Sequence, residues 1–317
     1  MNVLVTGGAG FIGSHVADAF LARGDRVWVL DSLTRGKREN VPAAAEFIQM
    51  DLVDPAVADL FRDVRFDLVS HHAAQVDVRV SVTHPAEDAR VNLLGLLNLT
   101  EAAVSVGTRR IVYVSSGGVV YGEPERRPTP ESAPKLPMSP YGVTKLGGEH
   151  YLYYYRNVRG LEYVALRYAN VYGPRQDPHG EAGVVAIFSN RLLENTPLTI
   201  YGDGEQTRDY VFVGDVVAAN LLAAGLVLPT SSDGLDAVAF NVGTGVETSV
   251  NRLAELLEKV AGTRPGREHR PARPGELLHS SLDCGRLKQH GWAPRRSIEQ
   301  GLADTYAYIA AERKRAR

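Results

Sequence analysis

The chain has 317 residues, of which 23% are charged and 44% hydrophobic, and its formal net charge is −2. This length supports one large or two modest domains. The balanced charge gives no overall positive excess of the kind that binds nucleic acid or an anionic membrane. One cysteine, Cys284, excludes an internal disulfide and a cysteine-based metal cluster. We expect a cytoplasmic protein without a signal peptide or membrane span, because no apolar run approaches the roughly 20 residues that a membrane helix needs.

The N-terminal stretch is typical of a βαβ unit. Its pattern predicts a strand over 2–6, a glycine-rich turn over 7–13, a helix over 11–23 and a strand over 27–30. Gly7, Gly10 and Gly13 are spaced for a tight turn, a close approach to a pyrophosphate and close helix packing. A strand before the glycines and a helix after them form the context that predicts nucleotide binding.

Asp31 closes the second strand of this unit. At that position a carboxylate reaches a ribose 2′-hydroxyl, and it would repel the 2′-phosphate of NADP. The sequence therefore predicts NAD as the cofactor, although Arg35, Lys37 and Arg38 lie close by and leave NADP open.

Strands and helices then continue to alternate. Strands are predicted over 46–50, 66–71, 110–114 and 162–165, with helices near 56–61, 85–106 and 141–156. The alternation indicates a parallel, doubly wound α/β sheet. Ligands of such sheets bind beyond the carboxyl ends of the strands, which places Asp51, Ala73 and Ser115 beside the cofactor.

Two features of this region have a functional and a structural interpretation. His71 and His72 could serve metal or proton chemistry, but no third ligand at a suitable spacing accompanies them, so we favour packing at the strand end. The helices near 85–106 and 141–156 have apolar faces, the second with a run of tyrosines at 151–155. These faces either pack within the fold or pair in a homodimeric helix bundle.

Tyr141 and Lys145 stand four residues apart and thus share one face of the predicted helix. A fixed positive charge close to a phenol favours the phenolate, which can exchange a proton with an alcohol. Such pairs are also common as plain surface contacts. The surrounding nucleotide-binding pattern favours the catalytic interpretation.

Beyond residue 170 the sequence becomes more irregular and glycine-rich. We predict a cofactor domain over 1–170 and a mainly substrate-binding domain over 171–317. Arg208 and Arg273 lie in its irregular segments, where paired guanidinium groups suit a diphosphate.

The chain resembles the NAD-dependent UDP-glucose 4-epimerase-like nucleotide-sugar epimerases of the extended short-chain dehydrogenase/reductase superfamily. The resemblance spans nearly the whole chain and is carried by Asn92 and the stretches 6–15, 31–36, 51–52, 72–75, 141–145, 166–174, 208–210, 273–276 and 291–292. It implies a Rossmann-type sheet with a smaller interleaved α/β substrate domain. Segments near 209–227 and 240–245 are then expected to return to the cofactor domain.

The resemblance also assigns residues to the two ligands. The NAD site is expected to include Gly7, Gly10, Phe11, Ile12, Gly13, Asp31, Ser32, Leu33, Thr34, Arg35, Gly36, Asp51, Leu52, His72, Ala73, Ala74, Gln75, Asn92, Ser115, Tyr141, Lys145 and Ala169. The UDP-sugar site is expected to include Ser116 and Gly117 beside the sugar, Asn170, Arg208 and Arg273 near the diphosphate, Thr199 and Tyr201 around uracil, and Val184, Glu276 and Ser280 elsewhere.

The implied mechanism is a transient oxidation. The Tyr141 phenolate removes the proton of the sugar 4-hydroxyl while hydride leaves C4 for the nicotinamide. The 4-keto sugar rotates and takes the hydride back on its other face, while Lys145 keeps the phenolate charged.

Two positions depart from or refine the family pattern. Members usually place a serine or threonine hydroxyl where this chain has Gly117. Ser116 is the candidate residue for that catalytic role, and an ordered water or another group is the alternative. Ser280 matches a position that is either large and aromatic or small. A small residue leaves room for an N-acetyl group, so UDP-N-acetylhexosamines are expected to enter as well.

Three alternatives remain open. A 4,6-dehydratase shares the fold but resembles a Thr-Asp-Glu pattern, where this chain has Ser116-Gly117-Gly118. A UDP-uronate epimerase would need a cation such as Arg79 for the carboxylate. A non-catalytic NAD-binding protein would have lost activity together with the hydroxyl at residue 117.

Overall fold

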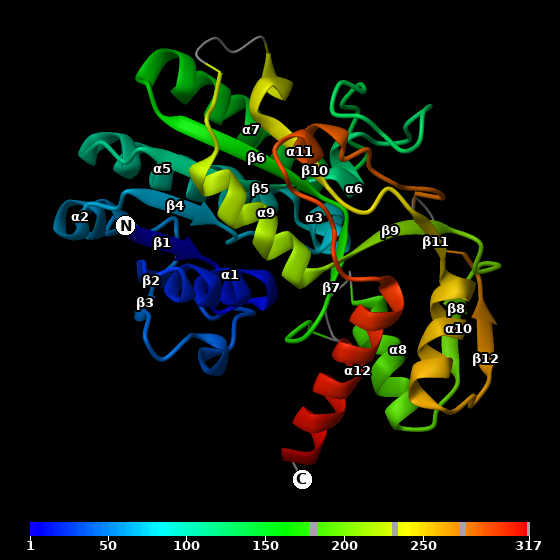
Figure 1. The fold of residues 1–317 in the computed structure, drawn as a ribbon. Helices are drawn as coiled ribbons and strands as arrows, with labels where there is room; N and C mark the ends of the chain where they lie inside the picture. Colours follow the sequence, from blue (N-terminus) through cyan, green and yellow to red (C-terminus); the bar gives the residue numbers. More distant parts are fainter. Residues whose placement is uncertain (178–182, 230–233, 273–276, 316–317) are drawn as a thin grey trace.

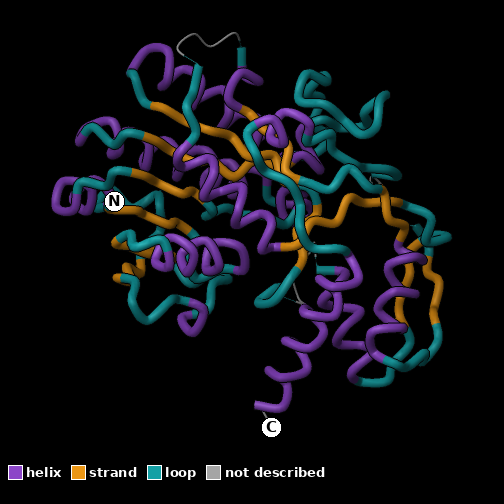
Figure 2. The backbone as a smooth tube through the Cα atoms, viewed as in Figure 1, coloured by secondary structure: helices purple, strands orange, loops and turns teal. Residues whose placement is uncertain are grey.

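The computed structural model describes residues 1–177, 183–229, 234–272 and 277–315 (Figures 1 and 2). A seven-stranded sheet with the order β10-β6-β5-β4-β1-β2-β3 forms the larger lobe, and all of its pairings are parallel. Its strands are β1 (Asn2–Thr6), β2 (Arg26–Asp31), β3 (Glu46–Gln49), β4 (Leu68–His71), β5 (Arg110–Ser116), β6 (Glu162–Tyr168) and β10 (Ala239–Val242). Apart from β10, this is the order of a Rossmann-type sheet, which confirms the predicted fold class.

Helices cover both faces of this sheet (Figure 1). One face carries α1 (Phe11–Ala22) and α9 (Val213–Gly225), and the other carries α2 (Val57–Val64), α5 (Gly95–Val106) and α7 (Pro140–Arg159). Alternate residues of β1 enter opposite cores, because successive side chains of a strand point to opposite faces. Burial on both faces explains why the central strands are apolar without interruption.

The helix expected over 85–106 is helical throughout but changes its winding. It consists of α4 (Pro85–Ala89), a π-helical turn η2 (Arg90–Leu94) and α5. Asn92 lies within the π-turn and is almost fully buried. Turns of this type occur frequently at functional sites.

The smaller lobe has its own core. β7 (Asn170–Tyr172), β9 (Thr207–Phe212) and β11 (Glu247–Ser249) form one sheet, and β8 (Leu198–Tyr201) pairs with β12 (Arg267–Arg270) in another. Three helices enclose a third apolar cluster with these strands: α8 (Val184–Leu193), α10 (Val250–Ala261) and α12 (Ile298–Arg315).

The chain crosses between the lobes more than once. After β9 it returns to the larger lobe as α9, which packs beside α1, and later as β10, which pairs with β6. The domain limits at residue 170 stay a prediction.

The remaining short helical segments are η1 (Arg38–Asn40), α3 (Val78–Thr83), α6 (Gly117–Val120), η3 (Leu235–Val238) and α11 (Gly285–Gln289). Within the described ranges, no helix combines the length and the apolar character required to cross a membrane.

Candidate active site

The turn after β1 is packed so closely that side chains are excluded at Gly7 and Gly13. Gly7 has φ +66°, and a Cβ there would lie 2.6 Å from the Ala73 backbone nitrogen. A Cβ on Gly13 would lie 2.3 Å from the carbonyl oxygen of Gly7, so α1 starts directly against the turn. The open side of this cradle is the N-terminus of α1, where Gly10 is the N-cap, which suits a pyrophosphate.

Asp31 lies at the end of β2 with its carboxylate held by the backbone. Oδ2 accepts from the Ala9 amide at 3.0 Å, and Oδ1 accepts from the Leu33 amide at 2.8 Å. A Cβ on Gly36 would lie 2.7 Å from the same Oδ1, so the loop wraps closely around the carboxylate. These bonds fix Asp31 beside the cradle, where a ribose is expected.

The loop after β4 is tied to the π-turn. Asn92 Oδ1 accepts from the Gln75 amide at 2.9 Å, and its Nδ2 donates to the Gln75 carbonyl at 3.0 Å. Asn92 also donates to Asp88 and Thr144, and the Thr144 hydroxyl donates to Asp88 at 2.7 Å. The predicted residues Gln75 and Asn92 are thus joined to the helix that carries Tyr141 and Lys145.

Helix α7 begins with Pro140 after an N-cap at Ser139, whose hydroxyl accepts from the Gly142 amide. Its face toward β5 is buried at Lys145, whose Nζ donates to the Val114 carbonyl at 3.0 Å. The same Nζ lies 5.8 Å from the centre of the Tyr141 ring. The two side chains predicted to cooperate therefore share one face of α7 at the carboxyl end of β5.

Burial lowers the pKa of Lys145 from 10.5 to about 8, and the nearby Asp88 carboxylate opposes this shift. Lys145 therefore remains mostly protonated at neutral pH, whereas the two histidines at the end of β4 stay neutral. Burial lowers the pKa of His72 to about 3, with a further contribution from Lys145, and lowers that of His71 in the same way. His71 is hydrogen-bonded to Thr6 and stacks on Tyr113, which agrees with the packing role.

Lys145→Met should stabilise the dinucleotide-free protein at pH 7, because burial disfavours the ammonium. The folded pKa lies below the unfolded one, so the unfolded chain binds more protons between pH 8 and 10.5, and the unfolding free energy contributed by Lys145 rises with pH there. At pH 7, burying the Lys145 ammonium lowers the free energy of unfolding by roughly 3 kcal/mol. The Met variant avoids this cost but loses the hydrogen bond to the Val114 carbonyl, which reduces its gain by about 1 kcal/mol.

Thermal melts of parent and variant at pH 7 and pH 9.5 measure this effect, and the difference should narrow at the higher pH. Lys259→Met, at an exposed site on α10, is the matched control and should show little change. A Lys145→Met protein less stable than the parent at pH 7 would contradict the prediction.

A buried ionic network anchors α7 one turn beyond Lys145. Glu149 and Arg167 are both fully inaccessible to solvent, and Arg167 Nε donates to Glu149 Oε1 at 3.0 Å. The Ser115 hydroxyl donates to the same oxygen, and Arg167 also donates to the Tyr121 hydroxyl at 3.0 Å. Strands β5 and β6 are thereby joined to the helix that carries the candidate catalytic pair.

The sequence reasoning missed Asp88, Thr144, Glu149 and Arg167. A signal existed for two of them: Arg167 interrupts an apolar strand, and Glu149 follows Lys145 by one helical turn on the same face. Buried charges are almost always paired, so such interruptions mark partners. Nothing in the local pattern singles out Asp88 or Thr144.

The end of β5 contains the position that departs from the family pattern. Ser116 and Gly117 follow Ser115, whose side chain is turned into the buried network. A Cβ on Gly118 would have the Ser116 hydroxyl at 3.9 Å and the Asn170 Oδ1 at 4.0 Å as its nearest neighbours. The structure thus brings together two predicted substrate residues, Ser116 and Asn170, from different strands.

The other predicted substrate residues lie in the smaller lobe or its connections. Thr199 and Tyr201 are partly exposed on β8, Arg208 is on β9, Val184 starts α8, and Ser280 is buried between the bridged residues 279 and 282. Arg273 and Glu276 lie outside the described residues. The assignment of all these residues to a nucleotide-sugar stays a prediction.

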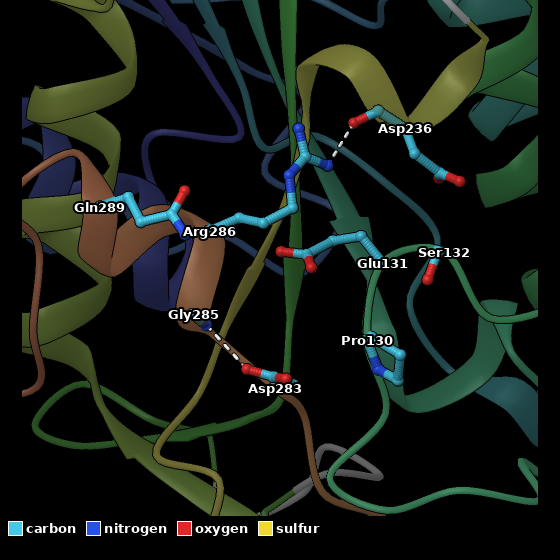
Figure 3. Close-up of a pocket in the computed structure, with 8 residues that line it drawn as sticks. All are labelled: Pro130, Glu131, Ser132, Asp236, Asp283, Gly285, Arg286 and Gln289. Atoms are coloured by element: carbon cyan, nitrogen blue, oxygen red, sulfur yellow. Dashed lines mark hydrogen bonds between the residues drawn. The ribbon is translucent and has the colours of Figure 1, made fainter.

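A separate cavity of about 400 Å³ opens near β10 and α11 (Figure 3). Its eight lining residues include Glu131, Asp236 and Arg286 but none of the predicted site residues. Asp236 forms an ion pair with Arg167 at 2.9 Å. The buried network described above therefore reaches from the end of β5 to the edge of this cavity.

Comparison with known proteins adds the following. The profile of the NAD dependent epimerase/dehydratase family matches residues 3–243. A UDP-glucose 4-epimerase of Mycolicibacterium smegmatis is 45% identical over 98% of both chains. The crystal structure of a Thermotoga maritima UDP-glucose 4-epimerase with UDP-glucose superposes with a TM-score of 0.93, 44% identity and 100% coverage of both chains. That of a Thermus thermophilus UDP-glucose 4-epimerase with NAD gives a TM-score of 0.90 at 47% identity, covering 98% of this chain and 99% of the other.

Proposed function

Since this chain belongs to the NAD dependent epimerase/dehydratase family, we propose that it is an NAD-dependent nucleotide-sugar 4-epimerase that interconverts UDP-glucose and UDP-galactose. The observation that carries the proposal is the pairing of Tyr141 and Lys145 on one face of α7, at the carboxyl end of β5. Nearly full-length similarity to enzymes described as UDP-glucose 4-epimerases supports it.

The residues present fit NAD. The cradle from Gly7 to Gly13 would hold the pyrophosphate, Asp31 the adenosine ribose and Lys145 the nicotinamide ribose. The chemistry that bound NAD supplies is reversible hydride transfer with C4 of the sugar. Because Asp31 bears a negative charge at the ribose position, NAD is favoured over NADP.

The chain's own contribution is proton transfer and positioning. Tyr141 takes the proton of the sugar 4-hydroxyl and returns it after the keto sugar has presented its other face. The Lys145 ammonium favours the phenolate, and His71 and His72, whose pKa values are lowered, add no competing positive charge at neutral pH. Asn170 and Arg208 would bind the diphosphate, with Thr199 and Tyr201 at the uracil, so the sugar can turn while its nucleotide stays fixed.

Two alternatives are less well supported. Arg79, the cation considered for a uronate, pairs with Asp77, its Nη2 lying 3.2 Å from Asp77 Oδ2. Strand β5 ends at Ser116 and two glycines of α6 follow it, so this segment supplies no acid for the elimination that a dehydratase performs. A 4-epimerase of neutral sugars fits these residues better.

The side chain of Ser280 is small, which supports entry of the N-acetylhexosamine pair as well as the hexoses. The cytoplasmic location stays a prediction from composition.

The deciding experiment denatures the purified protein, identifies the released dinucleotide, and assays UDP-galactose, UDP-N-acetylgalactosamine and UDP-glucuronate without added cofactor. We expect NAD, and inversion of the first two sugars at C4. A protein inert toward every UDP-sugar would defeat the proposal, and turnover of UDP-glucuronate alone would favour the uronate enzyme.

We further propose that the protein forms a homodimer through α7. Val143, Tyr151, Tyr154 and Val158 form an exposed stripe along this helix, and Leu94 is exposed on the neighbouring η2. One long helix with an apolar stripe suits a two-fold contact, because each copy presents the same surface to the other. A second copy of the chain is therefore the expected partner.

Tyr151→Arg should convert the dimer into a monomer, because each copy would bring an unpaired charge into the contact, where it loses its water. Sedimentation equilibrium measures the mass of each species. Val227→Arg is the control, since Val227 is 90% exposed but lies on the loop after α9. A parent protein that sediments as a monomer would end this proposal.

A further inference from the structure

Gly117 is in contact with a residue far away in the sequence. A Cβ on residue 117 would lie 2.5 Å from Leu282 Cδ1 and 2.9 Å from Cδ2. Both distances are shorter than real Cβ contacts, so a side chain at 117 requires Leu282 to move. The isobutyl group of Leu282 therefore fills the space that a serine or threonine at residue 117 would use.

Leu282 has little freedom to move aside. It is 1% exposed and belongs to the core cluster on the face of the large sheet that α1 and α9 cover. Its backbone amide donates to Asp209 Oδ2 at 3.2 Å. The residues on either side of Leu282 are both hydrogen-bonded to the backbone of Thr129. The Thr129 amide donates to the Ser281 carbonyl at 2.8 Å, and the Asp283 amide donates to the Thr129 carbonyl at 2.9 Å.

Asp209 makes this anchor firm. Its buried carboxylate accepts from the Thr244 amide and hydroxyl and from the Gly245 amide, in addition to Leu282. Burial raises the pKa of Asp209, and these hydrogen bonds oppose the increase. Because Asp209 follows the predicted diphosphate residue Arg208, the strand that would hold the substrate also fixes the position of Leu282.

The opposite side of the strand end is open and polar. Ser115 and Ser116 are consecutive residues of β5, so their side chains point to opposite faces of the sheet and Ser116 faces away from the buried network that holds Ser115. Its hydroxyl makes no hydrogen bond within the part of the chain that the structure describes. It borders the space above Gly118 together with the Asn170 side chain.

From these contacts we propose that Leu282 is a positioning residue: it keeps residue 117 free of a side chain and leaves the Ser116 hydroxyl to hydrogen-bond the reacting sugar oxygen. The proposal rests on the proposed epimerase function. It explains how the chain can lack the hydroxyl at 117 and still keep Tyr141 and Lys145 in place. Leu282 acts through the shape of the site, whereas Ser116 touches the substrate.

The test is a set of variants at these three positions. Gly117→Ser should lower the melting temperature because the site is overpacked, and adding Leu282→Ala should restore it. Ser116→Ala should lower kcat for UDP-galactose about 10²-fold with little change in KM, as expected for one positioned hydrogen bond that strengthens in the transition state. In the Gly117→Ser/Leu282→Ala background, Ser116→Ala should lower kcat less than about tenfold, because the hydroxyl of the new serine can make the hydrogen bond to the sugar oxygen instead.

Leu278→Ala, at a 64% exposed site in the same segment, is the control and should change neither the melting temperature nor kcat. Parental kcat in Ser116→Ala, or an equal loss in both backgrounds, would overturn the proposal. A parent that turns over no UDP-sugar instead defeats the proposed function. In that case the melting temperatures still decide whether Gly117 and Leu282 are coupled, and a stable Gly117→Ser protein would show that they are not.

Discussion

Tyr141→Phe should lower kcat for UDP-galactose by about 10²- to 10⁴-fold while leaving nucleotide-sugar affinity nearly unchanged. Phenylalanine keeps the ring but removes the hydroxyl that exchanges the proton of the sugar. Tyr141 is half-buried at the start of α7, and its ring lies beside the Lys145 ammonium, so this hydroxyl is the group that the site presents for proton transfer.

The measurement is the steady-state rate of UDP-glucose formation, together with the affinity for UDP-galactose by calorimetry. Tyr154→Phe, on the exposed side of the same helix, is the matched control and should retain parental kcat. If Tyr141→Phe turned over at the parental rate, another group would have to act as the base.

Glu149→Leu should destabilise the protein by about 3–5 kcal/mol, because it leaves the Arg167 guanidinium buried without its main counter-charge. Both side chains are fully inaccessible, so water cannot compensate. The hydroxyl of Ser115 would lose its acceptor as well. We expect a parallel loss of kcat, since the network fixes α7 against β5 one turn beyond Lys145.

Urea denaturation of the parent, Glu149→Leu and the double variant Glu149→Leu/Arg167→Met tests this. The double variant should recover part of the loss, because it removes the unpaired charge. Arg252→Met breaks an exposed ion pair with Glu255 on α10 and should cost less than about 1 kcal/mol. A Glu149→Leu protein as stable as the parent would show that the pair does not anchor the helix.

The sequence predicted those parts of the fold and site that are local. The glycine turn, Asp31 and the Tyr141–Lys145 pair each depend on spacing within one or two elements, and the structure places each group at the end of its strand or helix as expected. Their roles toward ligands stay predictions, drawn first from spacing and residue chemistry and then from the family resemblance.

The contacts that shape the site across long sequence separations were not predictable. In the sequence, nothing distinguishes Leu282 from other apolar residues. Only the folded structure shows that it contacts Gly117, 165 positions earlier. Asp88 and Thr144 meet because α4 packs against α7. Neither event leaves a periodic signal, since each depends on how elements pack.

Because the chain returns late to the larger lobe, the sheet of this lobe cannot be completed until most of the protein has been translated. Strand β6 has its outer neighbour only when residues 239–242 arrive as β10, and α1 has its packing partner only when residues 213–225 arrive as α9. The nascent chain therefore carries an unfinished sheet with an open edge while most of the smaller lobe is translated. An open edge invites pairing with other chains, so a fragment that stops near residue 170 is expected to aggregate on the ribosome unless a chaperone shields it.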